Sequence, residues 1–391
     1  MSSIKTMSFL DKLLKGIDVE WKQMKDVCTD FIVPMRDRPK IFDGNIPWCR
    51  IEDKEGQYFN KSKSGLCVSE EMIKKMNLKV YPTGTVICSC SASLGSYAIN
   101  TTPLITNQTF IGLVCGDSLF NKYLLYFMET QTRVLQELAT TGTIPYISRK
   151  KFEELLIPIP SPNNPKKSLE IQQKIVGILD TFTELTTELT TELTARKQQY
   201  SYYREKLLSF EEGEVEWKTL GEVIILQRGR RLVKSQLEVT GEYAVYQNAL
   251  TPLGYYHESN VKANTTFIIC AGAAGEIGFS DVDYWAADDV HSFITPDFIN
   301  SRYLFHFLQT QKNKISSQVR RASIPRLSKN VLEKLLFPIP SLEEQERIVS
   351  ILDKFDVLTT SISEGLPKEI ELRQKQYEYY RNQLLSFSAS R

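Results

Sequence analysis

The stretch RKQQYSYYREKLLSF, from Arg196 to Phe210, returns near the end of the chain as RQKQYEYYRNQLLSF, from Arg373 to Phe387. A long-period repeat of this kind constrains the architecture before any single motif is interpreted. The apolar positions of both copies are spaced by three and four residues, which predicts that each copy is the end of an amphipathic helix. We therefore expect two equivalent halves in one chain.

Three further blocks recur in the same order, working outward from this pair. They are IVGILDTF at 175–182 with IVSILDKF at 348–355, GTIPYISRKKFEELLIPIPS from Gly142 with ASIPRLSKNVLEKLLFPIPS from Ala322, and VEWK at 19–22 with VEWK at 215–218. The period is about 175 to 195 residues, too long for a solenoid and suited to two copies of a domain with a connector.

The first connector has a continuous apolar seam of coiled-coil type, predicting one helix of about 43 residues, or about 65 Å, comparable to two turns of B-DNA. The prolines of IPIPSPNNPKKS exclude helix before the seam, and Ser168 is expected to cap it. The seam consists of Ile171, Ile175, Ile178, Phe182, Leu185, Leu189, Leu193, Tyr200, Tyr203, Leu207 and Phe210. On the same helix, Glu184, Glu188 and Glu192 are expected to form a solvated or partner-facing stripe.

The second connector repeats the seam but contains Gly365-Leu366-Pro367. Proline is tolerated only in the first turn of a helix, so we expect a kink or a restart near Pro367. One seam alone could be buried against its own domain. Two matching seams favour antiparallel pairing with each other, because the chain must return. The repeated positions are Ile348, Ile351, Phe355, Leu358, Ile362, Tyr377, Tyr380, Leu384 and Phe387.

The regions between the connectors read as mixed and rich in strands. Thr85–Cys88 and Thr265–Cys270 are β-branched and aromatic runs bounded by glycine turns, and helical stretches follow at Asn121–Leu138 and Asn300–Ser316. The predicted fold class is α/β (α+β), with two strand-rich domains joined by two long antiparallel coiled-coil helices in a pseudo-twofold, cyclic arrangement. The expected segments are 1–18 packing near the C-terminal helix, 19–160 and 213–340 as the two domains, and 161–212 and 341–391 as the spacer helices.

Composition excludes several classes of protein. A chain of 391 residues exceeds the size of a single core, and its net charge of +1 excludes a uniformly basic nucleic-acid binder. No apolar run is long enough to cross a membrane and no signal peptide is evident, so a soluble, cytoplasmic protein without a membrane partner is expected. The seven cysteines are scattered without zinc-site spacing, and no metal site is expected.

Two short stretches could suggest chemistry, and both are better explained by structure. Gly272–Gly278 follows a predicted strand, but the next residues read as another strand or turn, which favours a tight hairpin over a cofactor loop. Glu20-Trp21-Lys22 and Glu216-Trp217-Lys218 have the acid-x-Lys spacing of metal nucleases, but no further acid precedes them after a proline. The chain has no Walker loop and no Asn-Pro-Pro-aromatic tetrapeptide, so neither ATP hydrolysis nor base methylation is expected of it.

As a set, the paired LLxPIPS stops, IVxILD helix starts and QYxYYRxxLL helix ends resemble the repeated regions of type I restriction-modification specificity subunits, over essentially the whole chain. The resemblance implies a non-catalytic subunit whose two target-recognition domains, 19–160 and 213–340, each read one half of an interrupted site in double-stranded DNA. It further implies that the helices set the gap and dock two methyltransferase subunits, which recruit restriction subunits. S-adenosylmethionine and ATP with magnesium then belong to those partners, and no cofactor belongs to this chain.

Readout of bases requires polar and basic side chains on loops, with Arg and Lys for guanine and phosphate and Asn or Gln for adenine. The candidates in the first domain are Arg36, Arg38, Lys40, Arg50, Ser89, Ser91, Ser93, Thr143 and Tyr146. Those in the second are Arg228, Arg230, Arg231, Lys234, Gln247, Asn248, Arg320, Arg321, Ser323 and Arg326. The alternative for each is an ordinary solvated surface. The loops of each half are expected to converge on one face, and Trp21 and Trp217 are interpreted as structural.

A different class of function, a coiled-coil interaction scaffold that does not bind DNA, would explain the seams equally well. It would leave two large, divergent domains with arginine-bearing loops unexplained. The DNA-reading interpretation is therefore preferred.

Overall fold

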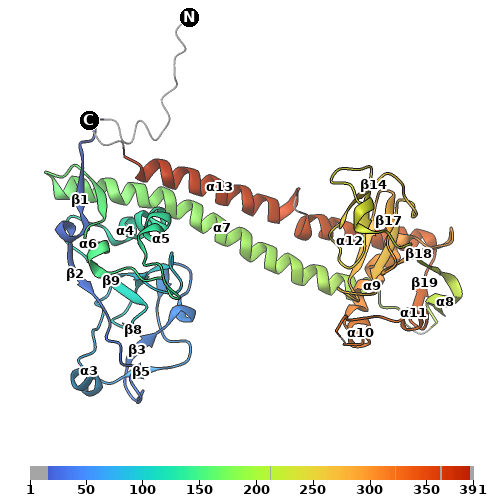
Figure 1. Ribbon diagram of the computed structural model, residues 1–391, viewed down its shortest axis with the longest axis horizontal. Helices are drawn as coiled ribbons and strands as arrows, with labels where there is room; N and C mark the ends of the chain where they lie inside the picture. Colours follow the sequence, from blue (N-terminus) through green and yellow to red (C-terminus); the bar gives the residue numbers. More distant parts are fainter. Residues whose placement is uncertain (1–15, 212, 322, 362, 388–391) are drawn as a thin grey trace, which may run out of the picture. The chain divides into compact units, whose positions relative to one another are not determined.

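A computed structural model of the chain describes residues 16–211, 213–321, 323–361 and 363–387. These residues form two compact units, shown in Figure 1. Unit 1 comprises the chain up to Thr187 together with the segment from Glu371, and unit 2 comprises Glu188–Ile370. Each unit thus combines one strand-rich domain with parts of both connectors. Of the N-terminal segment 1–18, residues 1–15 lie outside the described residues.

Unit 1 is organised around a five-stranded sheet in the order β2, β9, β6, β7, β4. Val86 and Cys88 of β6 face a core shared with helix α4, whereas Ile87 between them faces Phe59 and Phe110 on the other side. This alternation explains why the run is apolar throughout, since both faces of the strand are buried. The strands of the sheet are β2 (Cys28–Ile32), β4 (Tyr58–Phe59), β6 (Val86–Ser89), β7 (Tyr97–Asn100) and β9 (Phe110–Cys115).

Two smaller strand groups complete unit 1. A three-stranded sheet has the order β5, β3, β8, and β1 pairs with β10 so that Trp21 lies opposite Pro158. These strands are β1 (Val19–Gln23), β3 (Ile46–Cys49), β5 (Cys67–Val68), β8 (Ile105–Thr106) and β10 (Leu156–Pro160). The helices are α2 (Met24–Val27), α3 (Glu70–Met76), α4 (Asn121–Thr130), α5 (Thr132–Leu138) and α6 (Arg149–Glu153), with a 3₁₀ turn at Ile51–Asp53.

Unit 2 repeats this plan. A four-stranded sheet has the order β12, β18, β15, β16, a three-stranded sheet has the order β14, β13, β17, and β11 pairs with β19. The strands are β11 (Glu216–Thr219), β12 (Ile225–Arg228), β13 (Tyr243–Tyr246), β14 (Gly254–Tyr256), β15 (Thr265–Ile269), β16 (Ile277–Ser280), β17 (Tyr284–Ala286), β18 (Val290–Ile294) and β19 (Leu336–Ile339). The shorter helices are α8 (Leu220–Val223), α9 (Ser301–Thr310), α10 (Lys312–Ser317) and α11 (Lys329–Glu333), with a 3₁₀ turn at Lys234–Gln236.

The hairpin expected at Gly272–Gly278 is confirmed, because β15 and β16 pair antiparallel on either side of it. Gly272 and Gly275 have φ angles of 82° and 94°, a region that favours glycine. The helical stretches expected at 121–138 and 300–316 are each divided in two. Gln131 and Gln311, both at φ −87° and ψ 0°, separate α4 from α5 and α9 from α10.

The first connector is the single helix α7 (Pro165–Leu207) of 43 residues, as predicted. The prediction that Ser168 caps it was wrong. The side chain of Asn164 accepts a hydrogen bond from the Lys167 amide at 3.0 Å, and Pro165 occupies the first position, where its missing N–H costs nothing. Ser168 is instead buried in the first turn, where its hydroxyl accepts a hydrogen bond from the Gln172 side chain.

The second connector is two helices, α12 (Leu342–Thr360) and α13 (Gly365–Leu385). Pro367 lies in the first turn of α13, so the predicted restart is confirmed. The connectors pair antiparallel and in a cyclic order. In unit 1, Phe182 near the start of α7 stacks on Tyr380 near the end of α13 at 5.2 Å, and in unit 2, Tyr203 near the end of α7 stacks on Phe355 of α12 at 5.6 Å. None of the described helices combines the length and hydropathy needed to cross a bilayer.

Candidate nucleic-acid interface

Three loops meet at one end of the main sheet in each unit. In unit 2, the Cys270 amide donates to the Asp289 carbonyl at 2.7 Å, and the Leu327 amide donates to the Cys270 carbonyl at 2.9 Å. In unit 1, Cys90 donates to Thr109 at 2.8 Å and accepts from Ile147 at 2.8 Å. We call this repeated set of backbone hydrogen bonds the loop frame. Because it uses only main-chain groups, it leaves the side chains of the loops free to differ.

Unit 2 brings most of its predicted site residues to the loop frame. Arg320 and Arg326 exchange backbone hydrogen bonds of 2.9 and 3.1 Å, and Ala271 bridges Arg326. The Asn248 carbonyl accepts from the Ala273 amide at 2.9 Å, which joins the loop after β13 to the same cluster. Arg321 and Ser323 are exposed within the segment between the two arginines.

Arg228 and Arg230 approach the cluster from β12. The Arg228 Nε donates to the Asp288 carbonyl at 2.9 Å, and the Arg230 amide donates to the Ala286 carbonyl at 2.9 Å. Both side chains are exposed, as is Arg231, which follows them in the same loop. Gln247 is half-buried beside Asn248, and Lys234 is exposed in the 3₁₀ turn.

The basic side chains of this surface are not neutralised. In the part of the chain that the structure describes, no ion pair is formed by Arg228, Arg230, Arg231, Lys234, Arg320, Arg321 or Arg326. Burial, followed by the neighbouring Arg228, lowers the pKa of His291 on β18, so this ring adds no positive charge to the surface at pH 7. A surface with several uncompensated guanidinium groups attracts polyanions.

Unit 1 places different chemistry on the same loop frame. Ser91 bridges Tyr146, which is 40% exposed, and Ser93 and Thr143 are exposed nearby in the sequence of the same loops. Ser89 does not fit its predicted role. It is 2% exposed, and its hydroxyl donates to the Ser91 carbonyl at 3.0 Å, so it supports the loop from inside.

The four basic candidates of unit 1 lie on other segments. Arg36 and Lys40 are exposed on the segment after β2, and the Arg38 guanidinium lies over the rings of Trp48 and Phe42 at 5.1 and 5.7 Å. Arg50 is half-buried and forms an ion pair with Glu52 at 2.8 Å. No hydrogen bond among the described residues connects these four side chains to the loop frame, so the structure does not gather them with Ser91 and Tyr146.

The sequence reasoning missed the turns before β9 and β18. Gln108 in unit 1, and Asp288 and Asp289 in unit 2, belong to the segments whose carbonyls complete the loop frame, and all three side chains are at least partly exposed. A carboxylate here can accept a hydrogen bond from the cytosine amino group, and an amide can pair with adenine. The one sequence signal for these turns is their matching position after the two glycine hairpins, and it does not show which side chains are exposed.

Each unit is fastened to its connector helix by an acidic side chain of the ILD motif. In unit 1, Asp180 accepts from Lys122 and from the Tyr126 hydroxyl, both at 2.6 Å. In unit 2, Asp353 accepts from Arg302 at 2.8 Å and from His306 at 2.6 Å. These contacts hold α4 against α7 and α9 against α12, as seen in Figure 1.

The electrostatics of the unit 2 anchor are set by burial. The His306 side chain is fully buried, and burial lowers its pKa more than the hydrogen bond with Asp353 raises it, with the positive charge of Arg302 lowering it further. Burial alone would raise the pKa of Asp353, but hydrogen bonds from His306 and Arg302 outweigh it and the pKa lies below its usual value. The anchor is therefore a neutral histidine and an ion pair at neutral pH.

Other polar and sulfur groups are structural. Glu20 pairs with Lys22 at 3.3 Å and Glu216 with Lys218 at 3.0 Å on exposed strand faces, and the described residues contain no cluster of metal-ligating side chains. Burial raises the pKa of the Cys270 thiol to about 12, so it is not a nucleophile near pH 7. Trp21 packs edge-on against Phe127 and lies opposite Pro158, and Trp217 lies opposite Pro338 in the equivalent strand pair, although it is 41% exposed.

Comparison with known proteins gives a consistent result over the whole chain. A family model described as "Type I restriction modification DNA specificity domain" matches residues 17–196 and again 212–372. The Escherichia coli type I restriction enzyme EcoR124I/EcoR124II specificity subunit is 32% identical over 97% of both chains, and the E. coli EcoprrI specificity subunit is 33% identical over 92% of both. A crystal structure of the S subunit from M. genitalium, 18% identical, shares the fold with a TM-score of 0.61 over 96% of this chain and 98% of that one.

Proposed function

This chain belongs to the type I restriction-modification specificity subunits and contains two target recognition domains, and we propose that each of its two units reads one word of an interrupted DNA site. The observation that carries this proposal is the loop frame, which recurs in both units while its exposed side chains differ. An asymmetric, bipartite DNA site requires two recognition domains that share one architecture and carry different loop side chains.

In this proposal the base contacts of unit 2 come from Arg320, Arg326 and Asn248, supported by Arg228 and Arg230. Those of unit 1 come from Ser91, Tyr146 and Gln108. Guanidinium groups suit guanine and phosphate oxygens, whereas hydroxyl and amide groups read bases without strong electrostatic attraction. Readout in the major groove is the expected geometry, since it presents a distinct pattern for every base pair.

The chain itself is proposed to be non-catalytic and to act in a cytoplasmic complex with two methyltransferase subunits and, in the full assembly, restriction subunits. S-adenosylmethionine then serves the methyltransferase, and ATP with magnesium serves the restriction subunit. The one glycine-rich stretch that could suggest a cofactor loop, Gly272–Gly278, is a hairpin between antiparallel strands and lacks the following helix that such loops need. Partner subunits would supply the affinity that a chain of net charge +1 lacks.

The direct test is methylome sequencing of a host that lacks such systems. The chain is co-expressed with its cognate methyltransferase subunit, and the control expresses that subunit alone. New methylation at an interrupted, asymmetric motif only in the presence of this chain is expected. A soluble complex that produces no such motif would contradict the proposal and favour a scaffold role.

A second test addresses the connector. The middle of α7 contains the repeated unit of Glu184, Glu188 and Glu192, all exposed. Inserting one further four-residue Glu-Leu-Thr-Thr unit adds about one turn of helix. We expect the gap between the two methylated words to change while both words stay the same. An unchanged gap in a folded, active complex would show that α7 does not set the spacing.

A further inference from the structure

A groove between two short helices occurs at the same place in both units. In unit 2 it lies between α10 and α11, has a volume of about 350 Å³ and is lined by Lys314, Gln318, Ser328, Asn330, Val331, Lys334 and Leu335. In unit 1 it lies between α5 and α6 and is lined by Trp21, Gln131, Val134, Leu138, Lys151, Glu154, Leu155 and Leu156. The repeat aligns α5 with α10 and α6 with α11, so the two grooves are equivalent.

The linings differ although the surrounding fold does not. Leu155 and Leu335 occupy the same position in the two grooves. The positions of Val134 and Glu154 in unit 1 are those of Lys314 and Lys334 in unit 2. The unit 1 groove thus carries one cation, Lys151, and one acid, Glu154, whereas the unit 2 groove carries two cations and no acid. A difference confined to side chains, on a repeated backbone, indicates a property specific to unit 2.

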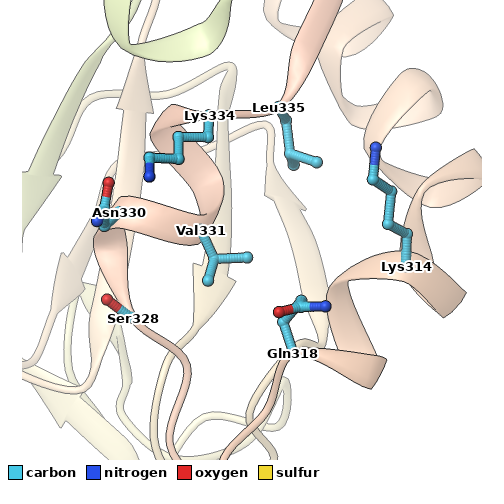
Figure 2. Close-up of a pocket in the computed structure, with 7 residues that line it drawn as sticks. All are labelled: Lys314, Gln318, Ser328, Asn330, Val331, Lys334 and Leu335. Carbon is cyan, nitrogen blue, oxygen red and sulfur yellow. The ribbon is translucent and has the colours of Figure 1, made fainter.

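The polar groove has the donors that an oxyanion needs. Figure 2 shows Gln318 and Val331 facing each other across the groove, with Lys314 on the α10 side and the Lys334 side chain extending beside Asn330 on the other side of α11. Both lysines are exposed and form no ion pair within the described residues, and no carboxylate belongs to the lining. Ammonium, amide and hydroxyl donors together are a typical combination for a DNA phosphate.

The groove lies at the base of the segment that carries the unit 2 arginines. Gln318 and Ser328 mark the two ends of that segment, and Arg320 and Arg326 pair with each other between them. Leu327, the residue before Ser328, donates the hydrogen bond to Cys270 that forms part of the loop frame. A duplex held by these arginines therefore brings its sugar-phosphate backbone near the groove.

We propose that the groove of unit 2 binds a backbone phosphate of the DNA flanking the word that this unit reads, and that unit 1 makes no equivalent contact. The inference rests on the proposed function and extends it. Lys314 and Lys334 supply the charge, and Gln318, Ser328 and Asn330 supply hydrogen bonds. Such a contact positions the domain on the duplex without reading sequence. In unit 1, Glu154 occupies the place of Lys334 and pairs with Lys150 at 3.7 Å, so the second cation of the unit 2 groove has no counterpart there.

The test uses the full chain assembled with its methyltransferase subunits and a duplex that contains the motif found by methylome sequencing. The Lys314→Gln/Lys334→Gln variant is compared with wild type and with Lys74→Gln/Lys75→Gln, which removes two exposed charges from α3 in unit 1. Losing one phosphate contact lowers the slope of log K against log salt by about 0.9. Between 50 and 200 mM salt, wild type should therefore lose about 3- to 4-fold more affinity than the variant does, and both should methylate the same motif. The α3 control should keep the wild-type slope.

A series of duplexes, each with one uncharged methylphosphonate, then locates the contact. Wild type should be sensitive at one position beside the unit 2 word at which the groove variant is insensitive. An unchanged slope, or identical sensitivity at every position, would overturn the proposal. A different result would also overturn it: inorganic phosphate stabilises the wild-type protein against unfolding but not the variant, while both bind DNA equally. That result would assign the groove to free phosphate. If the wild-type assembly does not prefer the motif to a scrambled duplex, the proposed function itself fails.

Discussion

Units 1 and 2 share a backbone plan and differ in the side chains that it presents. The main-chain hydrogen bonds of Cys90 and Cys270 are nearly identical, yet Tyr146 in unit 1 stands where unit 2 has Arg326, and Thr140 stands where unit 2 has Arg320. Since the loop frame is held by backbone groups and by the cores behind it, loop side chains can change at little cost to folding. In this molecule, the side chains proposed to recognise DNA can therefore differ without a change of fold.

The contacts that hold each unit to its connector helix, Asp180 in unit 1 and Asp353 in unit 2, show the opposite pattern. Lys122 with Tyr126 and Arg302 with His306 are different pairs of side chains that approach an aspartate of the same ILD motif. The position of the contact with the aspartate is the same in both units, whereas the residue types that make it differ. The difference is that an anchor must satisfy one half-buried acid in a fixed place, whereas a recognition loop must match an outside partner.

Disrupting the hydrophobic core of one unit is expected to have the largest effect on the free energy of unfolding. Phe337 is fully buried in unit 2, and Phe337→Ala should cost about 3 to 5 kcal/mol in the free energy of unfolding, because it removes a large apolar side chain and leaves a cavity. The neighbouring Leu336 is 57% exposed, and Leu336→Ala should stay within about 0.5 kcal/mol. Urea denaturation followed by circular dichroism measures both. Equal losses would mean that the inward and outward positions of β19 are assigned wrongly.

Changing the loops should have a smaller effect that is confined to one word. Arg326→Ala is expected to weaken binding by about 1 to 3 kcal/mol and to relax the sequence preference in the unit 2 word only. Tyr146→Ala, at the equivalent position, should relax only the unit 1 word. Binding to duplexes with substitutions in either word checks this. A variant of one unit that alters the preference for both words would contradict separate reading.

The anchors should make the pH dependence of the two units differ. The pKa of His306 is lowered by burial, so below its unfolded value of about 6.5 the unfolded chain binds a proton that the folded one does not. Stability is therefore full above about pH 6.5 and falls as the pH drops below it, by at most about 1.4 kcal/mol per pH unit. His306→Tyr introduces the residue found at the unit 1 position. It should reduce this slope in denaturation curves between pH 5 and 7 and leave the part due to His291, whose pKa burial also lowers. A slope equal to that of the wild type would assign all of it to another group.

The smallest effect is expected in the middle of α7. Glu188 is exposed, and Glu188→Ala should change the free energy of unfolding by less than about 0.5 kcal/mol. Phe182→Ala, which removes the stacking on Tyr380, is the matched change at a half-buried position of the same helix and should cost distinctly more. Thermal unfolding compares the two. A large loss from Glu188→Ala would indicate that the exposed stripe is held by a contact within the chain.

Much of the fold could be predicted because the repeat compares the chain with itself. The restart near Pro367, the hairpin after β15 and the antiparallel pairing of the connectors all followed from apolar spacing and from the positions of proline and glycine. Local capping did not, because Asn164 and Ser168 are both good caps and the choice depends on Ser168 being buried beneath Gln172. The divisions at Gln131 and Gln311 likewise come from packing, since neither glutamine breaks a helix by itself.

Among the predicted basic residues, the structure brings those of unit 2 to the loop frame and leaves those of unit 1 on other segments. Arginine clusters mark the unit 2 loops in the sequence, and the structure gathers them. Ser89 and Gln108 could not be ranked from sequence, because their exposure depends on the register of β6 and on which turn completes the loop frame. Arg38 and Arg50 were plausible by residue type, and their contacts with Trp48 and Glu52 appear only in three dimensions.

The central claim is that each unit reads its own word within one shared frame. The most direct measurement is the methylome of a host that expresses the methyltransferase subunit with a chimera in which residues 19–160 replace 215–340. Both recognition positions then carry the unit 1 loops, so the account predicts methylation at an interrupted palindrome made of the unit 1 word and its complement. Retention of the original second word, by a soluble and active complex, would contradict the claim.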